Sequence, residues 1–167
     1  MKTLVLLVAI LAFSSCEENG PIQQVVKTDT STSITVTDLD GKSSYSITDT
    51  ADISELVDGV DVFVAAEIES VGLKLENYSG GTIEGNITVK VGGITLFTSE
   101  TVSLSSVESV VTVPAAARNI LTLIQSSSAS GQFGITLEGN TTNGPITDDN
   151  DSFTLVVTPT ITGTVEL

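Results

Sequence analysis

Apolar and polar residues alternate one for one along much of this chain. The alternation is clearest in residues 33–37, 60–68, 87–91, 133–138 and 153–157. Side chains of an extended strand point alternately to its two faces, so this pattern predicts strands that bury one face. The frequent Val, Ile, Thr and Ser residues agree, because β-branched side chains suit strands. The chain is therefore predicted to be all-β.

Turn residues separate these runs. Gly92-Gly93 between Val91 and Ile94 predicts a two-residue hairpin with both glycines at positive φ. Residues 38–41 and 142–145 are further predicted turns, and residues 77–81 are predicted to join one strand pair. Many short strands at close turn spacing favour an antiparallel two-sheet sandwich.

Two segments depart from simple alternation. The apolar parity of residues 60–68 is reversed in residues 71–75, which predicts a β-bulge near Ser70. Residues 114–125 instead predict one short helix that covers one end of the sandwich, with Pro114 in its first turn. Its apolar residues recur at helical spacing, at Ala117, Ile120, Leu121 and Ile124.

The first residues have the order of a secretory signal. Lys2 precedes an apolar run over residues 4–13, and Ser14-Ser15-Cys16 follows. The run has about half of the ~20 apolar residues that a transmembrane helix needs. An ordinary signal peptide, cleaved near Ser15 and leaving a free thiol, is the alternative reading.

The segment Phe13-Ser14-Ser15-Cys16 resembles the lipobox of bacterial lipoproteins, although Phe13 replaces the usual aliphatic residue. The resemblance implies cleavage before Cys16 and a diacylglycerol on its thiol, which would hold the chain to the outer membrane of a bacterial envelope. The periplasmic and the surface-exposed side of that membrane both stay open. The expected domains are a signal peptide over residues 1–15, a tether over 16–21 and a β-sandwich over 22–167. This plan resembles small Gram-negative envelope lipoproteins with one immunoglobulin-like or jelly-roll-like sandwich.

Charge and missing residue types exclude several functions. The chain has 21 acidic and 6 basic residues, a net charge of −15, which disfavours nucleic acid as a partner. It has no His, which removes Ser-His-Asp and Cys-His catalysis and nearly all zinc sites. Its single cysteine cannot form an internal disulfide.

Two local motifs are candidate sites. The acidic loop containing Asp148, Asp149, Asn150 and Asp151 could bind Ca²⁺ through its oxygen atoms, although its spacing is not that of an EF-hand. A solvated loop is the simpler interpretation, and no other cofactor is expected. Asp49-Thr50-Ala51 resembles the acceptor motif for O-glycosylation in some bacteria, which would make Thr50 the modified residue.

Carboxylates alone could in principle support hydrolysis, if two of them lay about 5 to 9 Å apart in a cleft. Glu67, Glu69, Glu76 and Glu84 are the strand candidates, but they fall at the parity of a solvated sheet face. Arg118 is the only arginine, and it could pair with a local acid or with a partner's carboxylate or phosphate.

The sequence therefore predicts a non-enzymatic, lipid-anchored protein that binds or supports a protein partner, with strand edges available for pairing. Two alternatives stay open. The first is a carrier of an apolar ligand between the sheets, which requires an apolar cavity of several hundred Å³. The second is a carboxylate-only hydrolase, which requires two buried acids facing each other.

Overall fold

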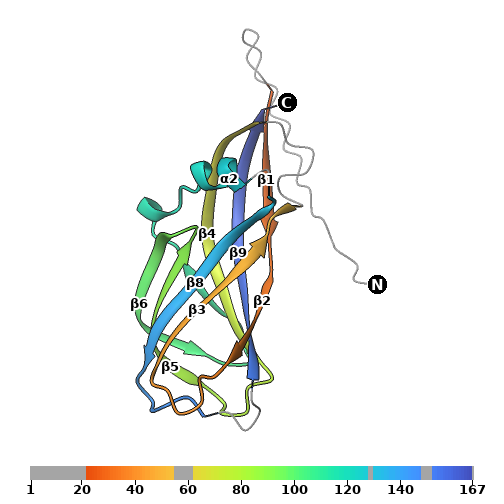
Figure 1. Cartoon of the computed structure of the whole chain (residues 1–167). Coiled ribbons are helices and arrows are strands. Elements are labelled where there is room, and N and C mark those ends of the chain that lie inside the picture. The colour runs from red at the N-terminus through yellow and green to blue at the C-terminus, as the bar shows by residue number, and fades with distance from the viewer. Residues whose placement is uncertain (1–21, 55–61, 128–129, 148–151, 167) are drawn as a thin grey trace.

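The computed structural model describes residues 22–54, 62–127, 130–147 and 152–166, and it forms two packed antiparallel sheets (Figure 1). This confirms the predicted all-β sandwich. One sheet contains β1 (Gln23–Asp29), β2 (Thr32–Thr37), β9 (Ser152–Glu166), β4 (Val62–Glu76) and β7 (Ser109–Thr112). The other contains β3 (Ser44–Asp52), β8 (Gln132–Thr141), β5 (Ile83–Val91) and β6 (Ile94–Leu104).

The strand pairing is that of a long hairpin rolled into two layers. β1 and β2 pair with β9, β3 pairs with β8, β4 with β7, and β5 with β6. This order is a jelly roll rather than an immunoglobulin-like fold. Gly92 and Gly93 form the tip of the hairpin, with φ of 55° and 83°, as the sequence predicted.

β1 and β2 are two halves of one edge strand, because their pairing with β9 keeps the same register on both sides of the break. The break lies opposite Pro159, whose carbonyl accepts a hydrogen bond from the Thr30 amide at 3.2 Å. Proline has no N–H to return to Thr30, so the ladder is interrupted there. The missing donor points to the edge strand and not to β4, which explains how a central strand tolerates a proline.

The core fills the space between the sheets with aliphatic and aromatic side chains. In β9 every second residue from Phe153 to Val165 is buried, as the alternation predicted. The predicted slip near Ser70 is confirmed by a register shift between Ile68 and Ser70. A second shift, between Phe63 and Ala65, was not predicted. It turns Phe63 into the core and leaves Val62 47% exposed, so the prediction that Val62 faces inward was wrong.

The predicted helix is present but divided. A 3₁₀ turn, η1 (Ala115–Ala117), precedes the short helix α2 (Leu121–Ser127). Between them the chain pairs with the upper edge of β4: the Ile68 amide donates to the Arg118 carbonyl, and the Ile120 amide donates to the Ala66 carbonyl, both at 2.9 Å. These bonds to β4 replace helical ones.

The prediction that residues 77–81 join one strand pair is wrong. This connection does not join a strand pair, because β4 and β5 belong to different sheets. It crosses the lower end of the sandwich, opposite the end that carries α2 (Figure 1). Tyr78 packs there against Phe153 in an edge-to-face contact with ring centroids 5.0 Å apart.

Candidate partner-binding surface

Several predicted site residues lie outside the described part of the chain. These are Cys16 with the tether, and the acidic loop Asp148, Asp149, Asn150 and Asp151. Thr50 is described: its side chain is exposed on β3, opposite Gly134 of β8. The Thr50 amide donates a hydrogen bond to the Asp49 carboxylate at 2.8 Å.

The described carboxylates lie at the surface. Glu69, Glu76 and Glu138 form ion pairs with Lys27, Lys74 and Lys90, with N–O distances of 2.6, 2.7 and 2.7 Å. Ser127 is the one polar or charged residue that is buried among the described side chains. Of the predicted acids, Glu67 and Glu84 are exposed on β4 and β5. The described residues therefore contain no pair of buried acids facing each other.

Among these acids, Glu69 interacts with both a lysine and a threonine. It occupies the bulge of β4 and accepts hydrogen bonds from Lys27 at 2.6 Å and from the Thr162 hydroxyl at 2.9 Å. These two bonds, with the nearby charge of Arg118, hold the pKa of the Glu69 carboxyl below its ordinary value. The same contact raises the pKa of Lys27. The arrangement stabilises the ionised pair, which is the opposite of what a general acid needs.

Within the described ranges, no group of three or more acidic, His or Cys side chains is placed to hold a metal ion. No helix in the same ranges combines the length and the apolar character needed to cross a membrane.

The clearest opening in the sandwich is the free edge of β7. Antiparallel pairs alternate between bonded and non-bonded residues. Because the Val113 amide donates to the Glu69 carbonyl at 2.9 Å, the backbones of Ser109 and Val111 also face β4. The backbone N–H and C=O groups of Val110 and Thr112 therefore point away from the sheet, and both residues are exposed.

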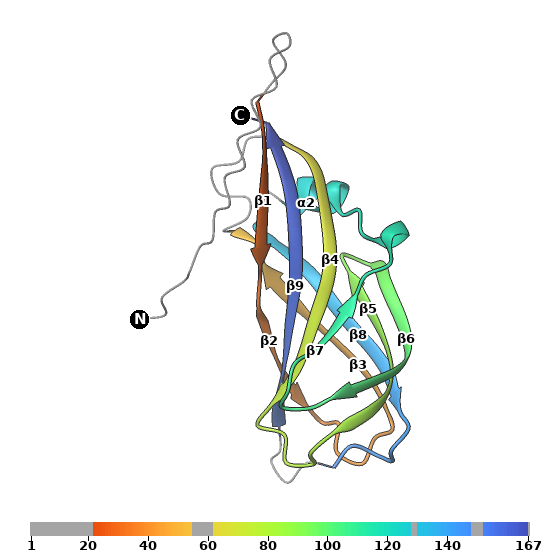
Figure 2. The same ribbon diagram turned by 180° about the vertical axis from the view of Figure 1, so that it is seen from behind.

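Two exposed valines accompany this edge. Val107 precedes β7 and is 73% exposed, and Val110 within β7 is 62% exposed. Glu108 lies between them in sequence, and its side chain covers the Cα of Gly72 on β4, where any larger residue would displace it. An uncharged edge strand, two exposed apolar side chains and one carboxylate thus lie close together in the chain. Figure 2 shows β7 beside β4 at the edge of their sheet, and this region is the β7 corner.

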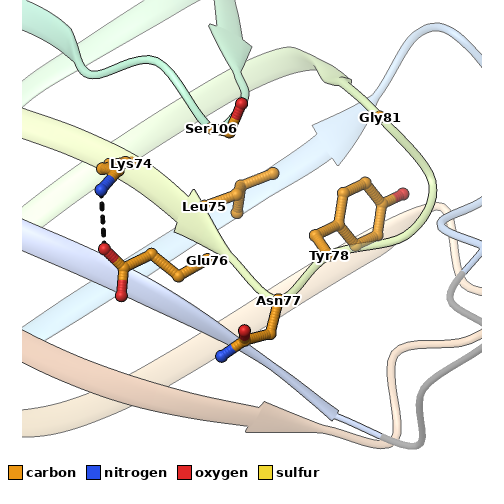
Figure 3. Close-up of a pocket in the computed structure, with 7 residues that line it drawn as sticks. All are labelled: Lys74, Leu75, Glu76, Asn77, Tyr78, Gly81 and Ser106. Carbon is orange, nitrogen blue, oxygen red and sulfur yellow. Dashed lines mark hydrogen bonds and ion pairs between the residues drawn. The ribbon is translucent and has the colours of Figure 1, made fainter.

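A hollow of about 440 Å³ lies beside this corner, between the end of β4 and the loop that leads into β7. Figure 3 shows Tyr78 and Leu75 on its wall and the Lys74–Glu76 ion pair at its rim. The Leu75 amide donates to the Ser105 carbonyl at 2.7 Å and fixes the loop in place. The lining residues are Lys74, Leu75, Glu76, Asn77, Tyr78, Gly81 and Ser106.

The sequence reasoning did not single out this surface. The available signal was weak: Val107 and Val110 stand in a run of Ser, Glu and Val without clear alternation. Arg118 was singled out, and the structure shows its Nε atom donating to the Val113 carbonyl at 2.8 Å. It thus holds the chain where β7 ends, and none of the ion pairs found in the described ranges includes it.

No protein-family model matches this chain, and no curated protein matches it. A solved structure of Desmodium yellow mottle tymovirus is 9% identical, with 93% of this chain and 94% of that chain covered and a TM-score of 0.36. A structure of infectious bursal disease virus strain Gx is 11% identical, with 87% and 37% covered and a TM-score of 0.35. A structure of infectious bursal disease virus strain Gt is 10% identical, with 99% of this chain and 38% of that chain covered and a TM-score of 0.27.

The chain spans less than two fifths of the two bursal disease virus chains that it matches. At these identities the likenesses assign neither a family nor a function to this chain. The jelly-roll assignment rests on the strand pairing described above.

Proposed function

We propose that this protein is a non-enzymatic lipoprotein of a bacterial outer membrane, anchored through acyl chains on Cys16, whose sandwich binds a protein partner. The anchor is supported by the lipobox-like segment ending at Cys16. A diacylated cysteine carries the two chains that stable anchoring requires. Partner binding is supported by the corner at β7.

The single observation that carries the proposal is the contrast between a filled interior and an open corner. The core residues of both sheets are buried, from Ile34 of β2 to Val165 of β9. Val107 and Val110, in contrast, leave apolar surface in water beside an unpaired strand edge. Single exposed valines are ordinary on a protein surface, so it is their position beside an unpaired strand edge that supports a docking site.

The carrier alternative gains no support from the described residues. The hollow of about 440 Å³ lies at the lower end of the sandwich and includes Lys74, Glu76 and Asn77. An apolar ligand would need a cavity between the sheets, where the described side chains pack against one another. Among the side chains that the structure describes, the hydrolase alternative lacks the buried acids that it requires.

The test combines chemical crosslinking in intact cells with mass spectrometry of the purified protein. We expect an N-terminal peptide that begins at Cys16 and carries acyl mass, together with one crosslinked protein partner. A Cys16→Ser variant should lose the acyl mass and the membrane fraction, while it keeps the β-sheet circular dichroism spectrum. A mature chain without acyl mass would overturn the anchor, and crosslinking to no protein would overturn partner binding.

A further inference from the structure

We infer that the free edge of β7 receives an extended segment of the partner protein as an added strand, and that this segment carries an apolar residue flanked by Lys or Arg. The inference rests on the proposed partner-binding function and specifies its mode. Strand addition needs outward-facing backbone groups, side-chain contacts that select the partner, and an edge that is not blocked.

The backbone groups are provided by Val110 and Thr112. Their N–H and C=O groups face away from β4, and within the described ranges no hydrogen bond from another element reaches them. β7 contains no proline and no charged residue, and no register shift interrupts its pairing with β4. Prolines, charged side chains and bulges are features by which natural edge strands avoid pairing, and β7 has none of these three, although it is only four residues long.

The rest of the same β4 edge is closed. Above β7 the backbone of Arg118 and Ile120 hydrogen-bonds to β4, and the Gln125 side chain donates to the Phe63 carbonyl at 3.2 Å. An added strand can therefore pair with β7 but not directly with the upper half of β4. This limits the added segment to a few residues.

The outer edge strand of the same sheet is less suited to the role. β2 also lacks charged residues, but its exposed side chains are the hydroxyls of Ser33, Thr35 and Thr37. The β1 half of that edge has Val25, which is 61% exposed, but it also contains Lys27 and Asp29. β7 offers Val110, with Val107 nearby, and has no charged residue within the strand, so an apolar side chain on the added strand would bury apolar surface there.

The charge of the occupant follows from complementarity. Glu108 is exposed beside Val110, and none of the ion pairs found in the described ranges includes it. Glu76 at the rim of the adjacent hollow is balanced by Lys74, and the whole chain has a net charge of −15. Lys or Arg residues on the added segment would be attracted to this corner, whereas Asp or Glu would be repelled. The same repulsion disfavours a second copy of this chain as the occupant.

The test uses hydrogen–deuterium exchange of the full chain in detergent with two short synthetic peptides. Both contain Val, Thr and Val, and one has Lys at each end while the other has Glu. We expect the Lys peptide to slow exchange of the Val110 and Thr112 amides. The Glu peptide should bind about tenfold more weakly, which corresponds to ~1.4 kcal/mol.

Two variants separate backbone pairing from side-chain contact. Val110→Pro removes an N–H that faces away from β4, so it should abolish protection at Thr112 and leave the β4 pairing in place. Val110→Thr keeps the N–H and should weaken binding without abolishing it. If the proline variant unfolds, the exchange pattern of the unmodified chain decides the question.

Other outcomes would overturn the inference. These are protection at β2 or β3 rather than β7, equal binding of both peptides, or a dimer of the unmodified chain in sedimentation that already protects β7. The strand addition and the proposed function can be contradicted separately. A partner that crosslinks in cells while β7 stays unprotected would contradict only the strand addition. Peptide protection without any partner in cells would remove only the function.

Discussion

The two halves of the β4 edge are treated differently by the fold. Along the upper half, the chain from Val113 to α2 hydrogen-bonds to β4 and buries Ile120 and Ile124. Along the lower half, the four residues of β7 pair with β4 and leave their own outer edge in water. Figure 2 shows both halves on the same strand. The upper half of the edge is thus closed by backbone hydrogen bonds and buried side chains, and the lower half ends in a strand with an unpaired outer edge.

This difference indicates which substitutions should change the stability of the fold and which should change only partner binding. Buried aliphatic side chains hold the upper half, so substitutions there should destabilise the fold. Exposed side chains occupy the lower half, so substitutions there should leave stability unchanged and affect only what binds. The following predictions test this separation, beginning with the largest effect.

Ile120→Ala should break the upper closure. Ile120 is 1% exposed and packs in the core beneath the segment that covers β4. Its truncation should lower the free energy of unfolding by about 3 kcal/mol, because it removes buried methyl groups and leaves a cavity. Urea unfolding followed by circular dichroism measures the change. The matched substitution Val110→Ala in β7 should cost less than about 0.5 kcal/mol, and equal costs would contradict the comparison.

Arg118→Ala should loosen the junction between the two halves. The Arg118 Nε atom donates to the Val113 carbonyl, and the side chain is only half-buried. Loss of this bond should cost about 1 kcal/mol of unfolding free energy. Hydrogen–deuterium exchange should also become faster at the amides of Ile68 and Ile120, which lie above the junction. Unchanged exchange there would show that the closure does not depend on Arg118.

The ion pair at the bulge predicts a modest loss of stability in acid. The Glu69 carboxyl has a lowered pKa in the folded chain, so its contribution is present above the ordinary pKa of Glu and is lost as the pH falls through the lowered value. Lys27 and Glu69 have side chains that are 57% and 39% exposed, so the pair is worth at most about 0.5 kcal/mol. Glu69→Gln should reduce stability at neutral pH and flatten this part of the acid profile. An acid profile identical to that of the unmodified chain would contradict the assignment.

Val107→Ser should have the smallest effect on the fold. The side chain is 73% exposed beside the open half, so we expect a change in unfolding free energy within about 0.5 kcal/mol. In the crosslinking experiment, however, the partner yield should fall, because the exposed apolar surface becomes smaller. A large loss of stability would show that Val107 is part of the core and not of a binding surface.

Much of the core could be predicted before the structure. The alternation at β5, β8 and β9 identified their buried faces, and Gly92-Gly93 identified the hairpin tip. The bulge near Ser70 followed from a reversal of parity. The second bulge did not, because Val60, Val62 and Val64 keep an apolar parity that hides the shift.

The candidate surface could not be predicted in the same way. Val110 is one of two adjacent valines, and nothing in its neighbours says which of them faces the core. The helical spacing of residues 114–125 predicted one helix, but the backbones of Arg118 and Ile120 hydrogen-bond to β4 instead of continuing it. The candidate residues Cys16 and Asp148 to Asp151 lie outside the described ranges, so their roles remain predictions.

By itself the sequence determined that this chain forms strands, which residues of most strands face inward, and where the tightest turn lies. These properties depend on neighbouring residues, because strand periodicity and glycine φ are local. Only the tertiary structure decided which strands lie side by side, how the helix is divided, and that β7 keeps a free edge. Each of these depends on hydrogen bonds between segments far apart in the chain, such as those from Ile68 to Arg118 and from Val113 to Glu69.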